Sequence, residues 1–206
     1  GDWASKFDAE RTRTMPFHIT QEKSVDVDMM FQKGSFLYGE PMEGLKVLEL
    51  PYHGEAVSMV ILLPRNGVEP LVQDLTPATL GQWVTSLEKS DVDVYLPKFR
   101  FQSRYSLQSP LQSLGMRQAF GGEADFSGMT GGKGLFINKV IHQADIEVHE
   151  EGTVAAAATA VILGKSVSLS ETFKADHPFI FLIRHRPTNA ILFMGCLMEP
   201  AGVERK

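Results

Sequence analysis

The chain has 206 residues and a formal net charge of −5, with 43% hydrophobic and 22% charged residues. This composition is ordinary for a soluble globular protein, and the length predicts one domain with a sizeable core. The negative balance argues against a nucleic-acid surface, and the sequence has no run of about 18 apolar residues to span a membrane, so we expect neither partner.

The first half of the chain predicts strands and one clear helix. Alternation over residues 25–29 predicts a strand, and the apolar runs 45–50 and 56–63 predict a hairpin. Thr76 can cap a helix that has Pro77 in its first turn. The apolar residues at helical spacing that support this helix are Leu80, Trp83, Val84 and Leu87.

Strand and turn patterns follow this helix. Alternation over residues 92–96 predicts a strand that stops at Pro97, and Ser109-Pro110 begins a short helix. The glycine cluster at 131–134 precedes a strand and lacks the spacing of a phosphate-binding loop, so we expect no phosphate site there.

Residues 140–148 alternate as a half-buried strand. One face would carry Val140, His142, Ala144, Ile146 and Val148. Because His142 lies among apolar neighbours, its local context predicts a core histidine held by a hydrogen bond.

The tract after this strand is rich in small side chains. It reads Glu150-Glu151-Gly152-Thr153-Val154-Ala155-Ala156-Ala157-Ala158-Thr159-Ala160. Gly152 can adopt backbone angles closed to other residues, so the chain can turn there or run straight on. Three interpretations stay open on local grounds: a short alanine helix, a linker, or an extended strand that could join a sheet.

The C-terminal part predicts a buried hairpin. Residues 179–183 and 191–198 are apolar runs separated by a polar turn. Cys196, the single cysteine, excludes a disulfide within the chain, and we expect it to be a small buried side chain. Together the predicted elements form a β-rich α+β chain with few helices.

The sequence has no local signature of an enzyme. Neither a Gly-x-Ser-x-Gly elbow nor a His-Glu-x-x-His motif is present. His149-Glu150-Glu151 lacks the spacing of a metal site, because strand alternation sends neighbours to opposite faces. Asp176-His177 suggests a charge-relay pair, but we interpret it as a loop-to-strand transition. We therefore expect no catalytic residue, metal or cofactor.

Several motifs together resemble the serpin family of serine protease inhibitors, because the tract from Glu150 is similar to the hinge of their reactive-centre loop. The other similar segments are Met29-Met30, Leu48-Glu49-Leu50-Pro51-Tyr52, Leu96-Pro97-Lys98-Phe99, Leu114-Gly115-Met116, Ala124-Asp125-Phe126-Ser127-Gly128-Met129, Phe173-Lys174-Ala175-Asp176-His177-Pro178-Phe179-Ile180-Phe181 and Ile191-Leu192-Phe193-Met194-Gly195. The resemblance covers nearly the whole chain and points to inhibitory serpins of the intracellular-type and neuroserpin-like branches. It implies the C-terminal portion of the serpin fold over residues 1–206, mostly antiparallel sheets, with the N-terminal half absent.

The resemblance implies a hinge and reactive-centre loop at residues 150–172. The implied hinge residues are Glu150, Glu151, Gly152, Thr153, Val154, Ala155, Ala156, Ala157 and Ala158. In the family's scheme a protease attacks the loop, forms an acyl-enzyme, and is trapped as the cleaved loop enters the central sheet as a strand. Alternation would turn Thr153, Ala155, Ala157 and Thr159 toward the sheet. Val154, where many relatives have glutamate, would point away.

Counting from the hinge in the family's manner places the reactive bond at Lys165–Ser166, with Ser166–Val167 as the rival. Lys165 before the bond would select a trypsin-like protease with an acidic pocket. Ser166 in that position would suit an elastase-like protease with a small pocket.

The resemblance also places Trp3 and His142 in the region where the central sheet opens, although a tryptophan that simply fills the core explains Trp3 equally well. It implies a monomer that inhibits a target serine protease and can form loop-sheet polymers. An extracellular location is favoured, with a cytoplasmic one as the alternative. The alternative functions are a non-inhibitory serpin, acting as a chaperone or ligand carrier, and an inactive fragment.

Overall fold

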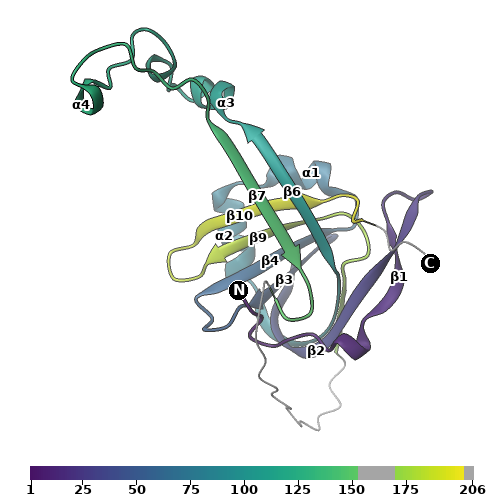
Figure 1. Ribbon diagram of the computed structural model, residues 1–206. Helices are drawn as coiled ribbons and strands as arrows, with labels where there is room; N and C mark the ends of the chain where they lie inside the picture. Colours follow the sequence, from purple (N-terminus) through teal and green to yellow (C-terminus); the bar gives the residue numbers. More distant parts are fainter. Residues whose placement is uncertain (153–169, 202–206) are drawn as a thin grey trace. The chain divides into compact units, whose positions relative to one another are not determined.

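The computed structural model describes residues 1–152 and 170–201. Where length alone predicted one domain, the chain divides into two compact units, one of Gly1–Phe99 with Glu147–Lys206 and one of Arg100–Ile146 (Figure 1).

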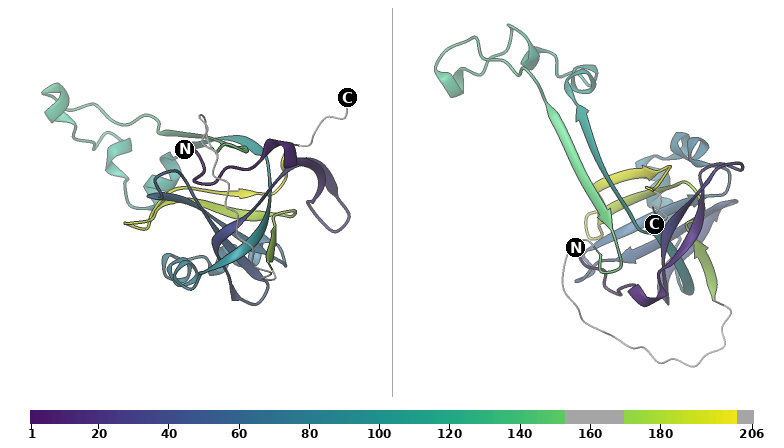
Figure 2. Two further views of the ribbon diagram at one scale, coloured as in Figure 1. Left: turned by 90° about the horizontal axis from the view of Figure 1, so that it is seen from below. Right: turned by 45° about the vertical axis from the view of Figure 1, so that its right-hand side comes forward.

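The larger unit is built around a mixed sheet with the strand order β10–β9–β4–β3–β2–β5–β8, and β1 also pairs with β2. Its strands are β1 (Arg13–His18), β2 (Ser24–Met42), β3 (Leu45–Pro51), β4 (Val57–Pro64), β5 (Glu88–Pro97), β8 (Glu171–Lys174), β9 (Phe179–His185) and β10 (Ala190–Leu197). All paired neighbours are antiparallel except β5 and β8, which run parallel. The order leaves β8 and β10 at the two edges of the sheet (Figure 2).

The long strand β2 has three partners along its length. It pairs first with β1, then with β5 from Met29 to Tyr38, and finally with β3. Alternation predicted only its beginning, because Gly34 interrupts the pattern further on. A Cβ atom at Gly34 would lie 2.9 Å from the ring of Phe36, so the missing side chain leaves room for that ring.

Two helices, α1 (Val68–Asp74) and α2 (Pro77–Thr85), contribute to the core of this unit, and a short 3-10 helix, η1 (Ala9–Arg11), precedes β1. The predicted helix cap is confirmed: Thr76 Oγ1 accepts a hydrogen bond from Thr79 N at 3.1 Å, and Thr79 Oγ1 accepts one from Thr76 N at 2.8 Å. The predicted hairpin is confirmed as β3 and β4. The buried core cluster contains Leu45, Val47, Val60, Leu62, Val68, Leu71, Leu80, Trp83, Leu87, Ile180 and Leu182.

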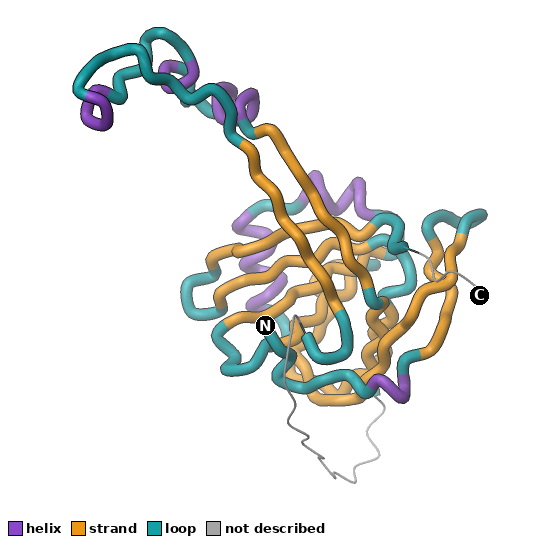
Figure 3. Tube along the Cα trace, in the orientation of Figure 1, coloured by secondary structure: helices purple, strands orange, loops and turns teal. Residues whose placement is uncertain are grey.

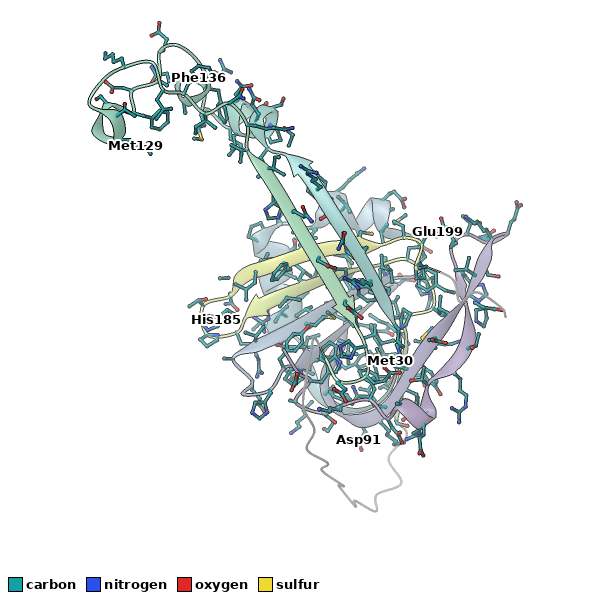
Figure 4. The ribbon with its side chains drawn as sticks, viewed as in Figure 1. Met30, Asp91, Met129, Phe136, His185 and Glu199 are labelled. Carbon is teal, nitrogen blue, oxygen red and sulfur yellow. The ribbon has the colours of Figure 1, made fainter. Side chains whose placement is uncertain are left out.

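The smaller unit is centred on a two-stranded ladder of β6 (Phe99–Ser106) and β7 (Ile141–Val148). The first residue of β6, Phe99, and the last two of β7, Glu147 and Val148, belong to the larger unit. Between these strands lie α3 (Gln108–Ser113), the 3-10 helix η2 (Gln118–Phe120) and α4 (Ser127–Thr130), joined by loops (Figure 3). Met129 is 78% exposed and Phe136 is 48% exposed in this segment (Figure 4). The smaller unit therefore buries less of its apolar surface than the larger one.

The C-terminal hairpin forms, but only one of its strands is buried as predicted. Phe179, Phe181 and Leu182 on β9 are fully buried. On β10, the exposed side chains are Ile191, Leu192, Phe193, Met194 and Cys196. The prediction that Cys196 is buried is therefore wrong. Successive residues of β10 point to opposite faces of the sheet, so both faces of this edge strand are uncovered by the described residues.

Candidate functional site

The turn that follows β7 is the first part of the predicted site that the structure describes. Gly152 has a φ of 114°, and a Cβ atom there would lie 2.5 Å from Gly1 O and 2.6 Å from Asp2 Cα. A residue with a side chain would both strain the backbone and collide with the N-terminal segment. The chain therefore turns at Gly152 instead of continuing the strand, which resolves the choice that the sequence left open.

Trp3 packs against this turn. Its indole Nε1 donates a hydrogen bond to His149 O at 3.0 Å, and its backbone N donates to Glu151 O at 3.1 Å. The ring stacks on Tyr52 with the centroids 4.6 Å apart, and Trp3 is only 3% exposed. Trp3 thus fills the core and also fixes the backbone just before Gly152.

Glu150 is anchored by its side chain as well as by its backbone. Its Oε1 accepts a hydrogen bond from Thr12 Oγ1 at 2.8 Å, its Oε2 lies 3.0 Å from Lys98 Nζ, and its carbonyl accepts from Phe7 N at 2.9 Å. Partial burial would raise the pKa of Glu150, but the hydrogen bonds from Thr12 and Lys98 and the charge of Lys98 outweigh it and lower the pKa. Glu151, the next residue, is exposed. The two adjacent glutamates therefore differ in environment: the Glu150 side chain is anchored and the Glu151 side chain is exposed.

His142 does not fit its local prediction, because it lies on the exposed part of β7. On the strand face that carries His142, the buried residues are Ile146 and Val148, nearer the end of β7. The core-histidine interpretation is therefore wrong for the described structure. His142 belongs to the smaller unit and Trp3 to the larger one.

The remaining predicted hinge residues, Thr153, Val154, Ala155, Ala156, Ala157 and Ala158, and the residues of the two proposed reactive bonds, Lys165, Ser166 and Val167, lie outside the described residues. The description resumes at Ser170, whose Oγ accepts a hydrogen bond from Lys33 Nζ at 2.9 Å. Strand β8 then pairs with β5, and Phe173 on it is fully buried. Both ends of the tract 153–169 are thus held by the larger unit.

The Asp176–His177 pair lies in the loop between β8 and β9. The Asp176 carboxylate lies 3.0 Å from His177 Nδ1 and 2.9 Å from Lys174 Nζ, and His177 Nε2 lies 3.2 Å from Pro64 O. Burial would raise the pKa of Asp176, but its bonds to His177 and Lys174 lower it to about 2. The Asp176 carbonyl also accepts from His18 N at 2.7 Å. These contacts join the loop to β1 and β4, as expected of a loop-to-strand transition.

Sequence reasoning missed a buried charge cluster around Glu49 on β3. Glu49 is 2% exposed, and its Oε1 accepts from Ser58 Oγ at 2.6 Å and lies 2.9 Å from Arg184 Nη2 and 3.1 Å from Arg186 Nε. The signal available in the sequence was a glutamate inside the apolar run 45–50. Arg184 and Arg186 also line a cavity of about 720 Å³ that is bordered by α2 and β10.

Within residues 1–152 and 170–201, no three histidine, cysteine, aspartate or glutamate side chains gather as a metal site requires. The same residues include no helix long and apolar enough to cross a membrane.

Comparisons with known proteins agree on one family. The family model described as serpin (serine protease inhibitor) matches residues 1–200. The chain is 46% identical to leukocyte elastase inhibitor from Sus scrofa, over 97% of this chain and 56% of that protein. It is 39% identical to neuroserpin from Gallus gallus, over 98% of this chain and 52% of that protein.

Two solved structures show the same fold. The structure of uncleaved ovalbumin matches with a TM-score of 0.83 and 35% identity, over 97% of this chain and 52% of that one. Human thyroxine-binding globulin complexed with thyroxine matches with a TM-score of 0.87 and 32% identity, over 97% of this chain and 54% of that one. The chain thus spans about half the length of the curated relatives it matches.

Proposed function

The chain belongs to the serpin family, and from this premise we propose that it is part of a serine protease inhibitor and not of an enzyme. The observation that carries the proposal is the small-residue tract after Gly152, because it begins at an anchored turn and ends at an anchored strand. Such a tract can be presented to a protease as a substrate and can then be extended into a sheet.

Loop insertion could release enough free energy to distort a bound protease. A strand of about 12 residues between two neighbours adds about 20 hydrogen bonds, each with a net contribution of roughly 0.5–1.5 kcal/mol. The total of roughly 10–30 kcal/mol rivals the stability of a whole domain. Insertion requires a face without a charge or a bulky group, and Thr153, Ala155, Ala157 and Thr159 meet that requirement.

An inhibitory role is favoured over a chaperone or carrier role. Non-inhibitory serpins are expected to carry bulky, charged or proline residues in the hinge, and residues 153–160 contain none. The Sus scrofa relative is itself named an elastase inhibitor. Val154 departs from the common glutamate, but its position on the opposite strand face leaves the insertion face unchanged.

The choice of target protease depends on which bond is cleaved. Cleavage at Lys165–Ser166, the bond favoured by the residue count, would select a trypsin-like protease. Several relatives are named leukocyte elastase inhibitor. Because an elastase-like protease has a small pocket that suits serine before the bond, these names favour the rival bond Ser166–Val167. Mass spectrometry of the peptide released by a panel of serine proteases distinguishes the two, because the two bonds give products that differ by one serine.

We propose that the inhibitor acts as a monomer and can form loop-sheet polymers, since an inserting strand can also enter a neighbour's sheet. The extracellular location favoured from the sequence finds no support in the comparisons, and the cytoplasmic alternative stands beside it.

The test of the inhibitory mechanism uses the complete protein that contains this chain. Thr153→Arg puts a charge on the insertion face, whereas Val154→Arg puts the same charge on the opposite face and serves as the matched control. We expect the Thr153 variant to be cleaved without forming an SDS-resistant protease complex, and the Val154 variant to form it at the original stoichiometry. Complex formation by both variants would contradict loop insertion. Absence of any complex with the unsubstituted protein would contradict the inhibitory function.

A further inference from the structure

A basic hollow lies at one edge of the large sheet, where β8 meets the ends of β2, β3 and β4. Its volume is about 320 Å³, and its polar lining consists of Glu40, Lys46, Arg65, Thr172, Lys174 and His177. All six residues belong to the larger unit, and three of them, Thr172, Lys174 and His177, follow the tract 153–169 in the chain. Thr172 is the last residue of the reactive-centre loop that the resemblance implies, and the other five lie outside residues 150–172.

Two lysines of the hollow are held in place and still have N–H groups to donate. Lys46 Nζ donates to Thr172 O at 3.0 Å and lies 3.7 Å from Glu40 Oε1. Lys174 Nζ lies 2.9 Å from Asp176. Each ammonium group has three N–H donors and its side chain is about one-third exposed, so each keeps donors for a ligand.

Arg65 supplies the third cation, directly after β4. Its backbone N donates to Gly44 O at 2.7 Å, which fixes its main chain against the β2–β3 turn. Within the described residues, no carboxylate forms an ion pair with its guanidinium. A guanidinium offers five N–H donors in a planar fork, the geometry that carboxylates and phosphates bind best.

We propose that Arg65, Lys46 and Lys174 form a binding site for the phosphate group of a small ligand. The three cations are accompanied by two carboxylates, Glu40 beside Lys46 and Asp176 beside Lys174, so one positive charge, that of Arg65, is in excess. This excess contrasts with the net charge of −5 of the whole chain. Donors from three separate elements can surround a tetrahedral group, whereas the two oxygens of a carboxylate would leave one donor element unused.

The size of the hollow leaves room for the phosphate to carry a small organic group. Small-molecule sites begin at about 300 Å³, and the volume here is about 320 Å³. A bound phosphate would also link β8, through Lys174, to β3 and β4, through Lys46 and Arg65. Ligand binding to the folded chain alone would therefore stabilise the attachment of β8 to the sheet.

The test is isothermal titration of the complete protein that contains this chain with inorganic phosphate and with glucose 6-phosphate, at constant ionic strength set by chloride. Arg65→Glu removes the free cation and places a carboxylate in the hollow, so we expect at least about tenfold weaker binding, with Arg65→Lys in between. Arg104→Glu is the matched control, because Arg104 is exposed on β6, outside the hollow. Circular dichroism and thermal unfolding without ligand show whether each variant is folded.

Several outcomes would overturn the proposal. They are equal binding by Arg65→Glu and the unsubstituted chain, an equal loss in Arg104→Glu, or acetate binding as tightly as phosphate. Tighter binding of glucose 6-phosphate than of inorganic phosphate supports a phosphorylated organic ligand, and equal binding supports the phosphate site without the organic part.

Discussion

Replacing Glu49 measures what the buried charge cluster contributes to the large sheet. Three donors converge on Glu49 Oε1, from Ser58, Arg184 and Arg186. In Glu49→Ala, Arg184, whose side chain is 11% exposed, keeps an uncompensated charge. Breaking a buried pair by removing one partner costs about 3–5 kcal/mol. Arg186 is 32% exposed and lies 3.6 Å from Glu55, so it can turn to solvent. We therefore expect a loss near the low end, about 3 kcal/mol of unfolding free energy.

Urea-induced unfolding followed by tryptophan fluorescence gives this free energy. Glu55→Ala is the matched control: Glu55 is 71% exposed, and a surface pair contributes less than about 1 kcal/mol. Glu49→Met combined with Arg184→Met should recover most of the loss, because no member of that pair stays buried and charged. A loss below about 1 kcal/mol for Glu49→Ala, or a double variant less stable than the single one, would refute the reasoning.

Three further predictions concern local features. Gly152→Ala should lower the unfolding free energy by at least about 1–3 kcal/mol in thermal unfolding, because its φ is 114° and the added Cβ atom would also collide with the backbone of the N-terminal segment. Gly121→Ala has open space around it and should change little, and equal effects of the two substitutions would contradict this reasoning. Because the folded-state pKa of Glu150 is lowered, its contribution to stability is complete above its ordinary pKa of 4.5 and is lost as the pH falls through the lower folded-state pKa. The stability difference between the native chain and Glu150→Gln should therefore shrink between pH 6 and 3 in denaturant titrations, and a constant difference would exclude the ionic contact with Lys98 as its cause. Thr76→Ala should cost about 1 kcal/mol through loss of the helix cap, measured by the urea midpoint, and no change would mean that the capping hydrogen bonds add nothing.

The elements that depend on local pattern were predictable from the sequence. The apolar runs that form β3 and β4 and the Thr76-Pro77 helix start specify their own conformation within a few residues. Burial was harder to predict. An apolar run shows that a strand is suited to burial, but it does not show whether another element packs on it. The exposed side chains of β10 and Cys196 were missed for that reason.

The contacts that anchor the candidate site depend on distant parts of the chain. Thr12 and Glu150 are 138 residues apart, and Glu49 and Arg184 are 135 apart. Periodicity within a window cannot pair residues at such separations. The family resemblance predicted a hinge from Glu150 onward and singled out Trp3, but the hydrogen bond from Trp3 to His149 required the three-dimensional structure.

The packing of Trp3 gives the protein an optical reporter of the turn before Gly152. The chain has two tryptophans, and the other, Trp83, lies in the buried core cluster of the larger unit. In a Trp83→Phe background, the emission would come from an indole that is stacked on Tyr52 and hydrogen-bonded to the turn before Gly152. Any movement of that turn away from the N-terminal segment would expose the indole and shift its emission to longer wavelength, so the motion could be timed by stopped-flow fluorescence without an added label.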